Sequence, residues 1–293
     1  MSATMEIELL PRELLGKVFS HVWNSNSRND NNGQESIKQC RLVSRHFNDV
    51  ASPFLITEVA VDLTLESFSR LETICRHPIF GKSVRKVVII LSYYEAELAS
   101  DKLFYIQEAH SRLLRHVEMH ERASFYRRRY PMTDECYEWL SGLGWGPTDR
   151  LVIADNDDNP PTPIQKLFSR AYDLYKEKYD NQERLRQNNS HIGRLCAALC
   201  SLSNLVSLEL EDPYTRLEKL DAVDFSDTGF NRDVLLHFDS IIRRSTWSGY
   251  HKTDHSATPP VEMLGLLCSQ LGEHGLRPKA ISLTLCPPPN MQV

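Results

Sequence analysis

The residues whose types and spacing could support chemistry are two pairs of potential metal ligands. His116 and His120 are four residues apart, and so are Cys196 and Cys200. On a helix this spacing places both side chains of a pair on one face, as two zinc ligands require. Neither pair is accompanied by further ligands at metal spacing, and the segment HVEMH lacks the HExxH order of zinc proteases. We therefore expect solvated histidines, core cysteines and no metal or other cofactor.

Two charged segments could contact ions. The acidic run from Asp155 to Asn159 is similar in composition to a calcium loop, but it has no glycine at the turn and no closing glutamate. We expect an exposed acidic loop. The basic run from Arg127 to Arg129 lies among aromatic residues and could contact phosphate or an acidic partner. In a chain with a formal net charge of -5, a solvated helical face is the favoured interpretation.

Recognisable catalytic motifs are missing from the sequence. It contains no glycine-rich phosphate loop, no G-x-S-x-G, and no Ser/His/Asp or Cys/His set in a familiar context. We therefore predict that the protein is not an enzyme. A hydrolase or metal enzyme with a site within residues 96–200 is a minor alternative, and a bound metal in the purified protein would support it.

Composition points to a globular protein of the cell interior. The chain has 293 residues, of which 41% are hydrophobic, enough for a sizeable core. A net charge of -5 provides no general basic field for nucleic acid or an anionic membrane. Seven scattered cysteines do not form a disulfide framework, and no run approaches the roughly 20 apolar residues of a membrane span. We expect a cytoplasmic or nuclear protein that binds neither nucleic acid nor membrane.

The elements that must position any functional residue begin with two helical segments. Residues 6–23 predict an amphipathic helix, with Pro11 in its first turn and an apolar stripe at helical spacing. Residues 24–36 are rich in asparagine and serine and predict an exposed loop. Residues 37–51 resume the helical spacing, and Ser52-Pro53 ends it.

Strands and helices then alternate. Residues 58–65 and 84–91 predict strands, and residues 67–77 between them predict a helix, so a parallel pair with a crossover helix is expected. Further patterns predict helices at 95–139, 164–200 and 261–272, and strands at 205–210 and 280–285. The predicted fold class is therefore α+β or α/β.

Two of these segments have the same order of helix, turn and strand. They are LCAALCSLSNLVSLEL and LLCSQLGEHGLRPKAISLTL, and each ends in the pattern x-x-S-L-x-L. Leucine-rich solenoids stack units of this kind. The spacing is too irregular for a formal repeat, so a degenerate solenoid and an ordinary α/β layer both fit.

The N-terminal segment resembles an F-box, a docking module that reads approximately LPxELLxxIF, a loop, and LVCrxFxxLaxPxLy. The matching residues are Leu10-Pro11, Glu13-Leu14-Leu15, Val18-Phe19, Arg41-Leu42-Val43-Ser44-Arg45, Phe47-Asn48, Ala51, Pro53 and Leu55. The loop between the halves is longer than is usual, and Ser44 stands where the family often has cysteine. The sequence that follows, to about residue 95, is similar to fungal F-box proteins with leucine-rich-repeat-like strands and helices.

The resemblance implies a three-helix module at residues 6–56 that binds a Skp-family adaptor and, through it, a cullin. An α/β, leucine-rich-repeat-like domain at residues 57–293, with a helical insertion at about 95–200, would bind an unidentified target protein. The chain would then be a substrate receptor of a ubiquitin ligase, or alternatively an interaction scaffold acting outside a ligase. Some motif residues must form the core of the helices. The residues that the resemblance implies for adaptor binding are Leu10, Pro11, Leu14, Leu15, Val18, Phe19, Leu42, Val43, Phe47 and Pro53.

Overall fold

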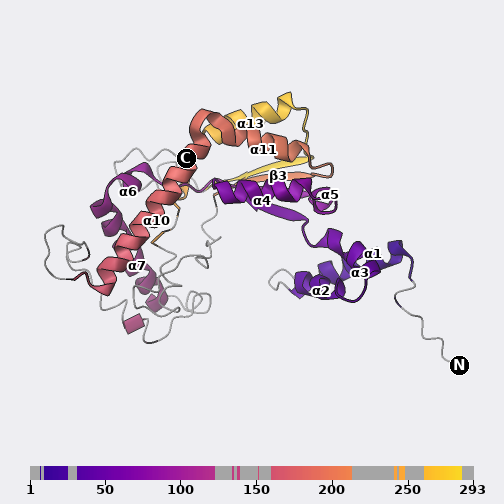
Figure 1. The fold of residues 1–293 in the computed structure, drawn as a ribbon, viewed down its shortest axis with the longest axis horizontal. Helices are drawn as coiled ribbons and strands as arrows, with labels where there is room; N and C mark the ends of the chain where they lie inside the picture. The colour runs from indigo at the N-terminus through magenta and orange to yellow at the C-terminus, as the bar shows by residue number, and fades with distance from the viewer. Residues whose placement is uncertain are drawn as a thin grey trace. The chain divides into compact units, whose positions relative to one another are not determined.

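The computed structural model describes residues 10–25, 32–122, 160–212 and 261–285, together with residues 7, 134, 137, 138, 151, 241, 242 and 244–247. These residues form helices and a small parallel sheet of four strands, a mixed α/β arrangement (Figure 1). The chain divides into two compact units. The first comprises Met1–Leu91, Gln187–Glu211 and Val261–Thr284, and the second comprises Ser92–Arg186, Asp212–Pro260 and Leu285–Val293.

Three short helices begin the first unit: α1 (Arg12–Ser25), α2 (Asn32–Cys40) and α3 (Arg45–Ala51). A 3-10 turn, η2 (Ser52–Phe54), follows with proline near its start, where no N–H is needed. The helices pack around a common apolar core of Leu15, Phe19, Ile37, Phe47, Val50 and Ala51. One aromatic contact, between Phe19 and Phe47 with ring centroids 5.4 Å apart, joins α1 to α3.

The helix boundaries correct two details of the sequence interpretation. The predicted loop at residues 24–36 is too long, because α2 already begins at Asn32; residues 26–31 lie outside the described part. The predicted helix at 37–51 is interrupted by a turn at residues 41–44. Ser44 causes a new helix to begin there: its hydroxyl accepts the backbone N–H of Phe47 at 3.3 Å, which makes it the N-cap of α3.

The parallel sheet contains β1 (Glu58–Val61), β2 (Lys86–Ile90), β3 (Ser207–Glu211) and β4 (Ala280–Thr284), in the order β1-β2-β3-β4. The predicted parallel pairing of the first two strands across a helix is confirmed, with Glu58 opposite Lys86 and Val61 opposite Ile89. Each pair of neighbouring parallel strands needs a crossover connection, so the chain returns along the sheet between one strand and the next.

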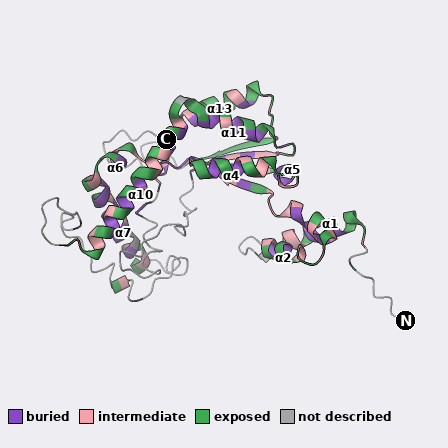
Figure 2. Ribbon diagram, in the orientation of Figure 1, coloured by how far each residue is buried: buried purple, intermediate pink, exposed green. Residues whose placement is uncertain are grey.

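A row of helices accompanies the sheet: α4 (Leu65–Arg76), α11 (Ser190–Cys200) and α13 (Glu262–Glu273) (Figure 1). Each helix has one buried side and one exposed side, as Figure 2 shows for α11 and α13. An ion pair between Arg194 and Glu72, 2.8 Å apart, joins α11 to α4, and the same guanidinium lies 5.5 Å from the ring centroid of Phe68. The short helix α5 (Phe80–Ser83) leads from α4 into β2.

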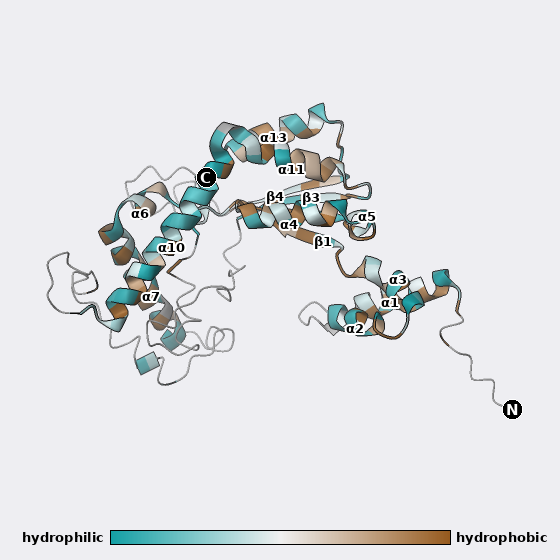
Figure 3. Ribbon diagram, in the orientation of Figure 1, coloured by the Kyte–Doolittle hydropathy of each residue, from teal (hydrophilic) through white to brown (hydrophobic). Residues whose placement is uncertain are grey.

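The second unit contains α6 (Ala96–Ser100), α7 (Lys102–Arg122) and the long α10 (Pro163–Arg186). Apolar residues of these helices, with Tyr94 and Ile242 from outside them, form a separate core that also includes Leu113 and Phe168. In the hydropathy view α10 is mostly teal, because it buries only one narrow stripe, whereas α11 and α13 carry more apolar residues (Figure 3).

The predicted continuous helix at residues 164–200 is interrupted. A 3-10 turn, η4 (Gln187–Asn189), separates α10 from α11, and Asn189 has a φ of 55°, a left-handed conformation that asparagine tolerates. A division between the units falls at this turn, because Gln187–Glu211 belongs with the sheet and the residues up to Arg186 do not. Within the described residues, none of the helices is both long and apolar enough to cross a membrane.

Candidate docking surface

Helix α1 carries two neighbouring apolar stripes that face different surroundings. Leu15 and Phe19 point into the three-helix core and are 0% and 2% exposed. Leu14 and Val18, each one position earlier, are 46% and 39% exposed. Because residues four apart lie on one face of a helix, Leu14 and Val18 form an apolar stripe on the outside of the module. Pro11 is exposed at the start of the same helix.

The turn between α2 and α3 exposes two more apolar side chains. Leu42 is 79% exposed and Val43 is 57% exposed. Their backbone N–H groups donate to the carbonyl oxygens of Gln39 and Cys40, at 3.0 and 3.2 Å. The turn is also fixed from outside, because Arg41 Nε donates to Asn48 Oδ1 at 2.8 Å. These two exposed side chains are therefore presented by a hydrogen-bonded turn.

The ten residues expected to bind the adaptor fall into three groups. The exposed ones are Pro11, Leu14, Val18, Leu42 and Val43; the partly exposed ones are Leu10 and Pro53; the buried ones are Leu15, Phe19 and Phe47. The three buried residues can act on a partner only by holding the helices in place. Ile7 is 51% exposed and is an apolar surface residue that the sequence analysis did not single out.

Such a surface can bind another protein but offers no group for covalent chemistry. Exposed apolar side chains concentrated in a few tens of residues are typical of sites that a partner covers. Leu14 and Val18 on α1, with Pro11 immediately before the helix, are spaced three and four residues apart and lie along one side, where a partner helix or helix pair can pack.

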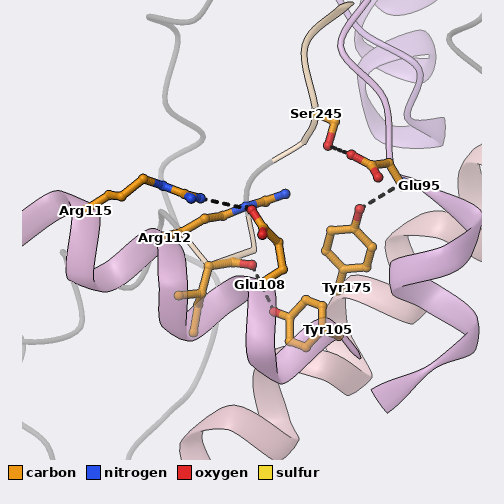
Figure 4. Close-up of polar contacts among 8 residues, drawn as sticks. Glu95, Tyr105, Glu108, Arg112, Arg115, Tyr175 and Ser245 are labelled. Atoms are coloured by element: carbon orange, nitrogen blue, oxygen red, sulfur yellow. Dashed lines mark hydrogen bonds and ion pairs between the residues drawn. The ribbon is translucent and has the colours of Figure 1, made fainter. Parts of the chain in front are cut away.

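The second unit contains a cluster of polar contacts that the sequence analysis missed (Figure 4). On α7, Glu108 accepts hydrogen bonds from Arg112 and Arg115, both at 3.0 Å. At the start of α6, the Ser245 hydroxyl donates to the carboxylate of Glu95, and the Glu95 backbone N–H donates to Tyr175 Oη at 2.8 Å. These contacts join residues up to 150 positions apart, so no local pattern could have predicted them.

Two buried tyrosines in this cluster are held in their neutral form. Burial raises the pKa of Tyr175 far above its usual value, and burial raises the pKa of Tyr105 in the same direction. The Tyr105 hydroxyl donates to the backbone carbonyl of Ile241 at 3.0 Å. Buried phenols that bond to backbone groups fix loops and helix ends in place. The contacts of these two tyrosines therefore assign them a structural role.

Gln182 has a similar role at the same end of the unit. Its side chain is 1% exposed and bonds to both backbone groups of Tyr94, accepting from the N–H at 2.8 Å and donating to the carbonyl at 3.0 Å. The amide of Gln182 thus replaces the strand partner that a buried backbone segment would otherwise need.

The expected core cysteines are only half confirmed. Cys196 is buried, and burial, with smaller effects from Cys200 and Glu273, raises its pKa to about 11. Cys200 is exposed, which contradicts the expectation. No group of three metal-ligand side chains occurs within the described residues. The side chain of His116, the basic run at 127–129 and the acidic run at 155–159 lie outside them.

Searches for similar proteins found no match among protein-family models, curated proteins or solved structures.

Proposed function

We propose that this protein is a substrate receptor of a Skp–cullin–F-box ubiquitin ligase, in which the helices α1 to α3 bind a Skp-family adaptor. The observation that carries the proposal is the pair of apolar stripes on α1. The motif residues Leu15 and Phe19 form the core, whereas the motif residues Leu14 and Val18 are exposed. A docking module needs both sets, because its core must hold the surface that the partner covers.

The remainder of the chain would hold the target protein. The parallel sheet and its row of helices α4, α11 and α13 support a leucine-rich-repeat-like interpretation of the first unit, since strand and helix recur in the same order along the chain. The mechanism would be proximity: tethering a target near the ubiquitin-transferring subunits raises its effective concentration without any catalytic residue in this chain.

Co-expression with a fungal Skp-family adaptor, followed by size-exclusion chromatography, tests the docking proposal. The variant Leu14→Asp/Val18→Asp adds two charges to the exposed stripe and leaves the core intact. A matched control is Leu65→Asp, because Leu65 is 39% exposed, as Val18 is, but begins α4 outside the three-helix module. Leu10 is left unchanged, since its side chain packs against the module's core.

We expect the wild type and Leu65→Asp to co-elute with the adaptor and the double variant to elute alone. Circular dichroism of each variant shows whether the helices are retained. If the wild type is stable but does not bind the adaptor, or if the folded double variant binds as tightly as the wild type, the proposal is wrong.

A second candidate function is an interaction scaffold that binds the adaptor but does not join a ligase. The same exposed stripe supports it, since adaptor binding is common to both functions. Addition of the cullin to the purified adaptor complex separates them. A ternary complex supports the ligase receptor, and exclusion of the cullin supports the scaffold.

A further inference from the structure

We propose that strand β4 pairs with β4 of a second copy of this chain, so that the protein forms a two-fold symmetric dimer through the edge of its sheet. The proposal does not rest on the docking function, because it concerns β4 and α13 only. The sheet has two edge strands, β1 and β4, and their outward-facing backbone groups have different surroundings.

The edge at β1 is covered by side chains of α4. The pairing with β2 leaves the carbonyl of Ala60 and the N–H of Asp62 pointing outward. Arg70 donates to the Ala60 carbonyl at 2.7 Å, and the Ser67 hydroxyl accepts the Asp62 N–H at 3.1 Å. Edge strands in natural proteins are commonly protected by such charged and polar side chains.

The edge at β4 has no such protection within the described residues. Ala280 N–H donates to the Val206 carbonyl at 3.1 Å, so its backbone faces β3. Because successive residues of a strand direct their backbone groups to opposite sides, Ile281 and Leu283 direct theirs away from the sheet. All five residues of β4 are exposed, and none is charged.

The side chains of the same two residues are apolar and open to solvent. By register, Ile281 continues a row with Val59, Val87 and Leu208, all of which are buried. On β4, however, Ile281 is 53% exposed, and Leu283, which lies opposite the buried Leu210, is 54% exposed. Val261, immediately before α13, and Leu266 on α13 are exposed apolar residues as well. The apolar layer therefore stops at β4 without a covering element among the described residues.

A second copy fits this edge because the strand is complementary to itself. Ile281 and Leu283 are placed symmetrically about Ser282. An antiparallel pair centred on Ser282 sets Ile281 opposite the Leu283 of the other copy, and each of the two such pairs can exchange both backbone hydrogen bonds. Their apolar side chains then meet on the same face as the existing row, which continues from one copy into the other.

The charged residue next to the strand favours the same arrangement. Lys279 immediately precedes β4. In the antiparallel pair the two Lys279 residues lie at opposite ends of the interface, roughly 20 Å apart at the usual strand rise. In a parallel in-register pair they would lie side by side, about 5 Å apart, and would repel each other.

A cysteine at position 282 tests the geometry directly. In the proposed pair the two Ser282 residues face each other across the axis with Cα atoms about 4.5 Å apart, within the range that a disulfide spans. Ser282→Cys should therefore form a covalent dimer under mild oxidation. Thr284→Cys is the matched control, because the two copies of position 284 would be roughly 14 Å apart and should not react with each other.

Multi-angle light scattering and sedimentation of the full chain measure the oligomeric state. We expect twice the 33.8 kDa monomer mass for the wild type, and a dissociation constant raised at least about tenfold in Leu283→Lys, with unchanged circular dichroism. A wild type that is monomeric at 100 μM, a Ser282→Cys that cross-links no more than Thr284→Cys, or a dimer unaffected by folded Leu283→Lys would each overturn the proposal.

Discussion

Two adjacent leucines on α1 offer the sharpest test of which side of the helix forms the core. We compare Leu14→Ala with Leu15→Ala, the same substitution one residue apart. Leu15 is 0% exposed and packs among Phe19, Ile37 and Phe47, whereas Leu14 is 46% exposed. If Leu15 forms the core and Leu14 lies on the surface, Leu15→Ala should destabilise the three-helix module strongly. Leu14→Ala should leave its stability unchanged and weaken adaptor binding.

The magnitude follows from burial. Truncation of a fully buried leucine loses its transfer free energy and leaves a cavity, and typically costs about 2–5 kcal/mol. A surface substitution usually changes stability by less than about 0.5 kcal/mol. Since 1.4 kcal/mol corresponds to a factor of 10, Leu15→Ala should increase the opening equilibrium of the three-helix module about 30-fold or more, and Leu14→Ala about twofold at most.

Amide hydrogen exchange across α1, α2 and α3 measures this equilibrium locally, which is preferable because the chain contains two compact units. We expect faster exchange throughout the module in Leu15→Ala and wild-type exchange in Leu14→Ala. Under the proposed function, Leu14→Ala should nevertheless weaken adaptor binding. Equal destabilisation by the two substitutions, or a larger effect of Leu14→Ala, would refute the assignment of inner and outer stripes.

Three further outcomes follow from the electrostatics and the buried polar contacts. The hydrogen bond from Arg194 lowers the pKa of Glu72 below its ordinary value of 4.5. This ion pair should therefore stabilise the fold by up to about 1 kcal/mol above pH 4.5, and this stabilisation should be lost as the pH falls further. Unfolding curves of Glu72→Gln should not show this loss. Tyr175→Phe removes the acceptor of a backbone N–H and should cost about 1–3 kcal/mol in chemical denaturation. Because the pKa of Cys196 is raised to about 11, iodoacetamide at pH 8 should alkylate Cys200 and spare Cys196, as peptide mass spectrometry would detect.

Strands and helices of the first unit were predictable because apolar side chains recur along them at strand or helix spacing. The alternation in residues 205–210 and 280–285 corresponds to β3 and β4, and the predicted helix at 261–272 corresponds to α13 within one residue at each end. The motif x-x-S-L-x-L is offset between these strands, since Ser207 lies opposite Ala280 and not opposite Ser282. An offset of two residues keeps every side chain on the same face of the sheet, so the apolar pattern is preserved.

Helix boundaries were harder to predict, because side-chain caps and single turns decide them. Asn32–Ser36 appeared to be loop from composition, yet these residues begin α2. The breaks before α3 and α11 depend on the hydroxyl of Ser44 and the left-handed backbone of Asn189. Neither residue interrupts the apolar periodicity around it, so a prediction from periodicity alone joins the helices on either side of each break.

The polar contacts of the second unit depend on residues far apart in sequence. Gln182 bonds to Tyr94 across 88 positions, and Ser245 bonds to Glu95 across 150. A glutamine in a charged helix predicts a solvated side chain, and only the tertiary arrangement shows that it is buried. The same limit applies to Cys196 and Cys200. Their spacing of four predicted that both would be buried on one face of α11, but Cys196 is buried and Cys200 is exposed.

The candidate docking surface has one feature that the sequence alone contained. At 100° per residue, the apolar positions of α1 from Leu14 to Val22 span a broad arc of about 140°. The side of the arc centred on Leu15 and Phe19 fills the core, and the side at Leu14 and Val18 is left over. Apolar side chains that the fold's own core leaves exposed indicate contact with a second body. Strand β4 repeats this pattern, because Ile281 and Leu283 continue the apolar positions of β3 and are exposed. The excess apolar surface at these two places, and not the buried core, is therefore where partner binding should be tested.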